Sequence, residues 1–126
     1  MTTSNIHKNE DGSYLRVLDL DSVPFEIKRI FLVSSENNIG CQRGGHAHHK
    51  CRQNLICLKG EIEILYENKE TKGMKILRPG ESFLHENMEW LIMVLTKRNS
   101  MLLSLCSEEY DEKDYIRDYD SFKKLL

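Results

Sequence analysis

Three of the five histidines of this chain fall within four positions, in the stretch Arg43-Gly-Gly-His-Ala-His-His-Lys50. In an extended strand, side chains two positions apart point to the same face, so His46 and His48 would project together and away from His49. An imidazole titrates near pH 6.5 and can both accept and give a proton at neutral pH. The pair is therefore a candidate acid–base site, with Arg43 as a candidate holder of a phosphate or a developing oxyanion.

The same histidines could instead hold a metal, because their spacing matches the first sequence motif of the cupin barrels. That motif is carried here by Gly40, His46, His48, Gln53 and Gly60. In metal-binding cupins a glutamate stands where Gln53 stands, and a histidine from a later strand completes the site. An amide is a poorer ligand for a divalent ion, and His85 is not at the usual offset. Proton transfer is favoured, with a metal site and a merely polar strand as the alternatives.

Composition limits the classes of protein that this chain can be. It has 126 residues, a formal net charge of −2 and apolar runs too short to cross a bilayer, which argues against a nucleic-acid or membrane partner. The polar first residues lack the apolar core of a signal peptide, so a cytoplasmic location is expected. None of the four cysteines forms a C-x-x-C pair, and free thiols are expected in a reducing compartment.

Short apolar runs separated by polar turns predict β-strands through most of the chain. The expected strands are residues 14–20, 29–33, 54–58, 61–66, 74–77, 89–95 and 101–106. Residues 54–58 and 61–66 flank Lys59-Gly60 and are expected to pair as a hairpin with a glycine turn. Strands about every ten residues are typical of a sandwich or barrel.

Residues 108–126 differ from the rest, because they are acidic, then aromatic, then basic. This order predicts a short helix, or two helical turns. The expected packing face consists of Tyr115, Ile116, Tyr119 and Phe122. The whole chain, residues 1–126, is therefore predicted to be a single all-β domain with a C-terminal helical tail.

Several motifs together resemble one protein family. They are Pro24-Phe-Glu-Ile-Lys-Arg29, Arg43-Gly-Gly-His-Ala-His48, Gln53 with Leu58-Lys-Gly60, Trp90 with Met93, and Tyr110-Asp-Glu-Lys-Asp-Tyr-Ile-Arg-Asp-Tyr-Asp-Ser-Phe122. With them the chain resembles the nucleotide-sugar 3,4-ketoisomerases, the WxcM-like branch of RmlC-type cupins, which act on dTDP-4-keto-6-deoxyglucose. The resemblance covers about residues 12–124, and the last motif is its most specific part.

The resemblance implies a cupin jelly-roll barrel and a homodimer that can exchange its N-terminal strand. It implies an isomerase that needs no metal or other cofactor and binds a dTDP-linked 4-keto-6-deoxy sugar. His46 and His48 match the catalytic histidine pair. The implied substrate-binding residues are Arg43, Tyr14, Gln53, Trp90 and Met93. The 3-keto product would supply an aminotransferase that makes 3-amino sugars for surface glycans.

The chain also departs from the family at positions that often carry tyrosine, where it has Phe31, Leu32 and Leu84. These changes remove hydroxyl groups that could relay protons or contact the sugar. A cupin that binds a nucleotide sugar without catalysis is therefore the second hypothesis. A metal-dependent cupin enzyme is the third, and Gln53 argues against it.

Overall fold

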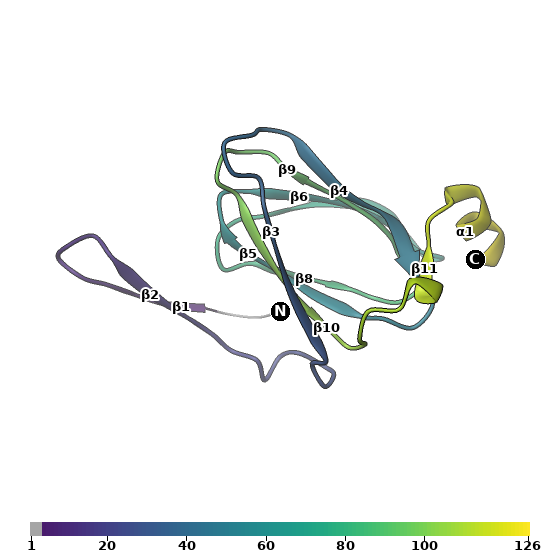
Figure 1. The fold of residues 1–126 in the computed structure, drawn as a ribbon, viewed down its shortest axis with the longest axis horizontal. Helices are drawn as coiled ribbons and strands as arrows, with labels where there is room; N and C mark the ends of the chain where they lie inside the picture. Colours follow the sequence, from purple (N-terminus) through teal and green to yellow (C-terminus); the bar gives the residue numbers. More distant parts are fainter. Residues whose placement is uncertain (1–3) are drawn as a thin grey trace.

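The structure is a computed structural model that describes residues 4–126, and two antiparallel sheets form most of it (Figure 1). The strands are β1 (Ser4–Lys8), β2 (Tyr14–Leu18), β3 (Arg29–Ser34), β4 (Cys41–His48), β5 (Gln53–Lys59), β6 (Ile62–Glu67), β7 (Lys72–Leu77), β8 (Ser82–His85), β9 (Trp90–Leu95), β10 (Met101–Cys106) and β11 (Tyr115–Ile116). A 3₁₀ turn at Glu112–Asp114 and helix α1 (Tyr119–Leu125) complete the described elements.

The strand order gives the predicted cupin jelly roll. One sheet has the order β3-β10-β5-β8, and the sheet facing it has the order β11-β4-β9-β6-β7. Apart from the β6–β7 hairpin, neighbours in these sheets are not consecutive in sequence, as expected when the chain passes from one sheet to the other between successive strands. Aliphatic side chains from both sheets fill the space between them, including Leu55, Ile64, Leu91 and Leu102, all at most 1% exposed. The all-β prediction is confirmed.

The hairpin predicted for residues 54–66 is wrong. β5 and β6 follow one another in sequence, but β5 pairs with β10 and β8, whereas β6 pairs with β9 and β7. Gly60 is a corner between the two sheets, with a φ of +75° and a position so close to Ser100 that a Cβ would lie 2.2 Å from its hydroxyl oxygen. The glycine signal therefore marks a change of sheet and not a two-strand turn.

The C-terminal tail is less helical than its composition predicts. Tyr115 and Ile116 form β11, which pairs antiparallel with the end of β4, and only residues 119–125 form an α-helix. Ile116 and Phe122 do pack, together with Trp90, on the outer side of the second sheet. The 3₁₀ turn at Glu112–Asp114 lies before β11, and Asp111 is its N-cap.

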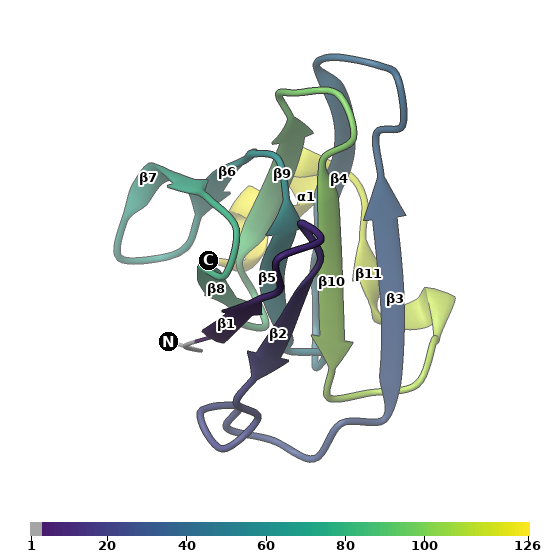
Figure 2. The same ribbon diagram turned by 90° about the vertical axis from the view of Figure 1, so that its left-hand side faces the viewer.

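The N-terminal strands stand apart from the barrel. β1 and β2 pair only with each other among the described residues, and Figure 1 shows them extending away from the two sheets. Figure 2, turned by 90°, shows β3 at the free edge of its sheet. Leu15 on the hairpin and Ile30 and Leu32 on β3 are each more than half exposed. No helix in the described part of the chain is long and apolar enough to span a membrane.

Candidate active site

A bulge in β4 directs the histidines. The pairing of β4 with β9 shifts its register between Gly44 and His46, and Gly44 and Gly45 have φ angles of +89° and +78°. A Cβ on Gly44 would lie 2.7 Å from a backbone oxygen of β9, so only glycine allows the strands to approach this closely. Such a bulge bends a strand and redirects the side chain that follows it, which here is His46.

The sheets enclose a cavity of about 520 Å³, which has the size of a small-molecule site. Four of the predicted site residues line it, namely Arg43, His46, Gln53 and Met93. The structure therefore brings together side chains from β4, β5 and β9 that are as many as 50 positions apart in the sequence. Phe31 and Leu32 form part of the wall on the β3 side, so the departures at these two positions make this wall apolar.

His48 lies directly behind His46. The two ring centroids are 5.0 Å apart with nearly perpendicular planes, and His48 is only 1% exposed. Burial, followed by the charges of His48 and Arg117, lowers the pKa of His46 to about 4. Burial also lowers the pKa of His48, although its hydrogen bond to Asp114 acts in the opposite direction. Both imidazoles are therefore neutral at neutral pH and able to accept a proton.

Asp114 orients the His48 ring. Its Oδ2 lies 3.1 Å from His48 Nδ1, while the backbone amides of Lys50 and Cys51 donate to the same carboxylate at 2.7 and 3.1 Å. A carboxylate accepts hydrogen bonds only, so the proton of His48 sits on Nδ1 and its Nε2 carries the lone pair. That Nε2 is buried and has no hydrogen-bond partner among the described residues. The arrangement is that of an oriented general base.

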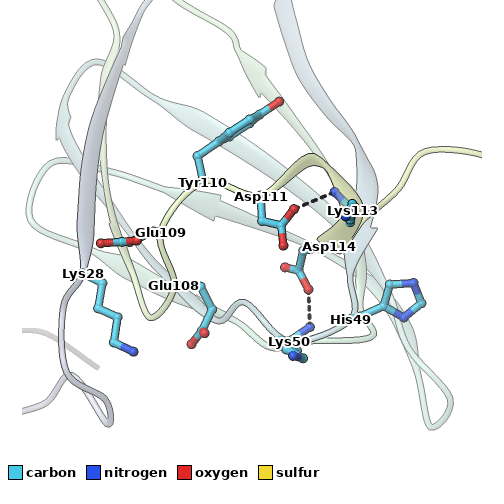
Figure 3. A pocket seen from close by; sticks show the side chains of 9 residues that line it. All are labelled: Lys28, His49, Lys50, Glu108, Glu109, Tyr110, Asp111, Lys113 and Asp114. Atoms are coloured by element: carbon cyan, nitrogen blue, oxygen red, sulfur yellow. Dashed lines mark hydrogen bonds between the residues drawn. The ribbon is translucent and has the colours of Figure 1, made fainter.

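The opposite side of Asp114 borders a second hollow, of about 750 Å³, outside the barrel (Figure 3). Its lining residues are Lys28, His49, Lys50, Glu108, Glu109, Tyr110, Asp111, Lys113 and Asp114. In Figure 3 the Asp114 carboxylate accepts a hydrogen bond from the backbone amide of Lys50, and the His49 ring points away from the other side chains. His49 follows the last residue of β4 and is exposed. Asp114 thus connects the buried imidazole to a wall that faces solvent.

A third histidine reaches the cluster, contrary to the sequence argument. His85 pairs with Gln53 across β5 and β8, and its ring centroid is 5.9 Å from that of His48. Its Nε2 donates to the backbone oxygen of Glu89 at 2.7 Å, and complete burial lowers its pKa to about 3. The sequence argument excluded His85 because of its offset from the preceding proline and glycine. The register between β5 and β8 sets its position instead.

One group of potential metal ligands converges within the described residues. His48, Cys51 and Asp114 offer ligand atoms within 4.8 Å of one another. An imidazole, a thiol and a carboxylate suit a borderline ion such as Zn²⁺. The Asp114 carboxylate already accepts three N–H hydrogen bonds, however, and these account for its position in full. These residues differ from the cupin ligand set expected from the sequence, with which they share only His48.

The tail contributes two residues that the sequence argument did not assign to the site. Tyr115 and Arg117 line the cavity, while Ile116 between them packs outside with Phe122. This alternation follows from the strand period of two, since β11 extends the sheet beside β4. The Tyr-Ile-Arg order is the signal that could have revealed the strand, and the acidic and basic flanks of the segment obscured it.

Two predicted substrate contacts lie elsewhere. Trp90 faces away from the cavity and packs against Phe122 and Tyr119, with ring centroids at 5.5 and 5.3 Å. Because Trp90 and Met93 are three positions apart on β9, they point to opposite faces of the sheet. Tyr14 lies on the projecting hairpin and is 49% exposed. Leu84, a further departure, lines a small pocket beside Ser22 and Pro24 instead.

Comparison with known proteins adds independent evidence. Residues 1–126 match the family model described as FdtA: WxcM-like, C-terminal. The TDP-4-oxo-6-deoxy-alpha-D-glucose-3,4-oxoisomerase of Aneurinibacillus thermoaerophilus is 30% identical over 116 residues, which cover 91% of this chain and 83% of that protein.

Two solved structures are also similar. One is a histidine-to-asparagine variant of the 3,4-ketoisomerase QdtA from Thermoanaerobacterium thermosaccharolyticum in complex with TDP-4-keto-6-deoxyglucose. It is 28% identical, with a TM-score of 0.84 and coverage of 98% of this chain and 90% of that one. The other is a 3,4-ketoisomerase from Helicobacter canadensis, 33% identical, with a TM-score of 0.82 and coverage of 98% and 92%.

Proposed function

This chain belongs to the FdtA, WxcM-like family, and we propose from this premise that it is a sugar 3,4-ketoisomerase. Its substrate is a TDP-linked 4-keto-6-deoxyglucose, which it converts to the 3-keto isomer. The observation that carries the proposal is a pair of neutral imidazoles in a member of this family, with His46 half-buried in the wall of a sugar-sized cavity and His48 buried behind it.

The chemistry follows from the acidity of the substrate. The C3 proton lies next to the C4 carbonyl, so a neutral base of ordinary strength can remove it and leave an enediol or enediolate. Return of a proton to C4 then gives the 3-keto sugar. His46 and His48 are the acid–base residues, because both are neutral and one lines the cavity directly in front of the other.

Binding of the nucleotide part relies on cationic side chains. Arg43 and Arg117 line the cavity from β4 and from the segment after β11. The Arg117 guanidinium already donates to both oxygens of Glu112, at 2.7 and 2.8 Å, so Arg43 is the side chain that binds the phosphate oxygens with two parallel hydrogen bonds. Gln53, 3% exposed, can both donate to and accept from a sugar hydroxyl. Met93 supplies an apolar surface at the base of the cavity. No metal or cofactor enters these steps.

The protein acts as a homodimer in this proposal. The β1–β2 hairpin exposes Leu15 and Val17, and β3 exposes Ile30 and Leu32 at the free edge of its sheet. A partner's hairpin that adds to this edge would cover both apolar surfaces and pair the open backbone groups of β3. It would also carry the partner's Tyr14 toward the cavity, whose wall includes β3. The test is the molar mass in solution, which should halve when residues 1–18 are removed.

The product has a defined place in metabolism. A 3-keto group is the carbonyl that an aminotransferase needs to install a 3-amino group, so the enzyme supplies the 3-keto substrate of an aminotransferase that makes 3-amino sugars for surface glycans such as lipopolysaccharide. We place this step in the cytoplasm. The absence of a spanning helix among the described residues is consistent with this location.

Nucleotide-sugar binding without catalysis is the second candidate, and the apolar Phe31 and Leu32 in the cavity wall favour it. One experiment separates the candidates. The protein is incubated with dTDP-4-keto-6-deoxyglucose, with and without a chelator, and products are identified by NMR. A 3-keto product in both arms supports the isomerase. Binding without conversion supports the second candidate, and conversion lost only on chelation supports a metal enzyme. His49→Asn is the matched control for His46→Asn and His48→Asn, because His49 is exposed outside the cavity.

A further inference from the structure

The proposed isomerisation needs a proton donor that the two histidines do not supply. Removing the C3 proton pushes charge onto O4, which must be protonated or held as an oxyanion. His46 and His48 are neutral at neutral pH, so each can accept a proton but neither holds an acidic one to give. The β3 wall offers no hydroxyl at positions 31 and 32, which are Phe31 and Leu32.

Tyr115 brings a phenol to this place from a different element. It lines the cavity from β11 and pairs with His48 in the antiparallel register of β11 and β4. Its ring centroid is 4.3 Å from that of His48 and 4.9 Å from that of His46. A single side chain thus contacts both imidazoles and the cavity.

Two arginine side chains lie beside Tyr115. The guanidinium of Arg117 lies over the Tyr115 ring at 4.3 Å from the centroid. Arg29 approaches from β3, where burial lowers its pKa but hydrogen bonds to the Cys106 and Tyr115 side chains raise it above the usual value overall. Arg29 also lies 5.5 Å from the centroid of the Tyr110 ring and 5.7 Å from that of Phe31, which lines the cavity. The Tyr115 hydroxyl is therefore held between β11 and β3, beside both imidazoles and the cavity.

We propose that Tyr115 is the catalytic acid of the isomerisation, exchanging its phenolic proton with the two substrate oxygens. This inference rests on the proposed function. In the first half, a histidine takes the C3 proton while Tyr115 gives its proton to O4, which forms the 3,4-enediol and a tyrosinate. In the second half, the tyrosinate takes the O3 proton while the protonated histidine gives its proton to C4. The substrate becomes the 3-keto sugar, and both residues return to their starting states.

The test compares Tyr115→Phe with wild type and with Tyr119→Phe. Tyr119 donates a hydrogen bond from its hydroxyl to Glu67 at 2.6 Å, on the outside of the barrel. The measurements are kcat on dTDP-4-keto-6-deoxyglucose and the dissociation constant for dTDP. Tyr115→Phe should lower kcat by about 10²-fold or more, as for loss of a general acid, with unchanged dTDP binding. Tyr119→Phe should leave kcat unchanged.

A second variant keeps the side chain and changes only its acidity. Fluorotyrosine at position 115 has a more acidic phenol, so the alkaline limb of the kcat/KM profile should move to lower pH by the difference between the phenols. A purely structural tyrosine would leave that limb in place. An unmoved alkaline limb overturns the proposal, and so does a near-normal kcat in Tyr115→Phe. In either case the isomerase function stands. An inactive wild type that still binds the substrate overturns the proposed function, and the catalytic role of Tyr115 with it.

Discussion

Replacement of Asp114 by asparagine tests whether the Asp114 carboxylate sets the orientation and tautomer of His48. The carboxylate accepts hydrogen bonds from the His48 ring and from the backbone amides of Lys50 and Cys51. An asparagine has one accepting oxygen and one donating NH₂ group in the same space. Its oxygen can accept from the Lys50 amide in the place of Oδ1, but its NH₂ group then takes the place of Oδ2 and faces both His48 Nδ1 and the Cys51 amide. The imidazole must place its lone pair on Nδ1 and its proton on Nε2, which removes the free base.

The expected magnitudes follow from this change of tautomer. Loss of a general base lowers kcat by about 10²- to 10⁴-fold, and Asp114→Asn should fall in this range. One buried amide is left without a full acceptor, which costs about 1–3 kcal/mol of unfolding free energy. The hydrogen bond to Asp114 also raises the pKa of His48 against the effect of burial. Its loss lowers that pKa further, so the acidic limb of the kcat/KM profile should move to lower pH.

The assay is the rate of 3-keto product formation as a function of pH, with unfolding by urea followed in parallel. Asp111→Asn is the matched control, because it lies in the same turn and accepts from Lys113 without touching a histidine. The control should retain wild-type kcat. Normal kcat in folded Asp114→Asn, or an acidic limb that stays in place, would refute the idea that Asp114 sets the tautomer of His48.

Three further outcomes are expected. The folded-state pKa of His85 is about 3, below its ordinary 6.5, so the unfolded chain binds more protons between these values, and the protein loses stability as the pH is lowered from 7. At pH 5 this residue alone should cost about 2 kcal/mol relative to pH 7, measured by urea unfolding with His85→Gln as the variant that flattens the slope. Gly44→Ala should lose about 1–3 kcal/mol more stability than Gly45→Ala, since both have positive φ but only Gly44 meets a backbone oxygen at 2.7 Å. Trp90→Phe should lower the melting temperature and leave KM unchanged, whereas a raised KM would restore the substrate contact inferred from the sequence.

The fold and half of the site were predictable because their signals are local. Strand alternation separates His48 from His49, and cupin spacing places Gln53 in the same cavity as His46. These relations depend on positions within one or two neighbouring strands. Many short strands without helices between them predict a sandwich or barrel, and the resemblance to the family narrows this to the jelly roll.

The remainder of the site depends on pairings that local patterns do not encode. His85 reaches His48 through the register of β5 against β8, and Tyr115 reaches both histidines through the pairing of β11 with β4. Composition favoured a helix at 108–126, but hydrogen bonds to the edge of β4 stabilise a strand at Tyr115–Ile116 instead. The hairpin predicted around Gly60 was wrong for the same reason. The pairing of each strand depends on packing within its sheet and not on the turn that precedes it.

The measurement closest to the central claim is the fate of the C3 proton of dTDP-4-keto-6-deoxyglucose in D₂O, followed by NMR with wild type and His48→Asn. The account predicts that the wild type forms the 3-keto sugar and exchanges the C3 proton in the presence of a chelator, and that the variant does neither while still binding dTDP. Exchange and conversion at the wild-type rate in the folded variant, or their loss from the wild type on chelation, would contradict proton transfer by the histidine pair.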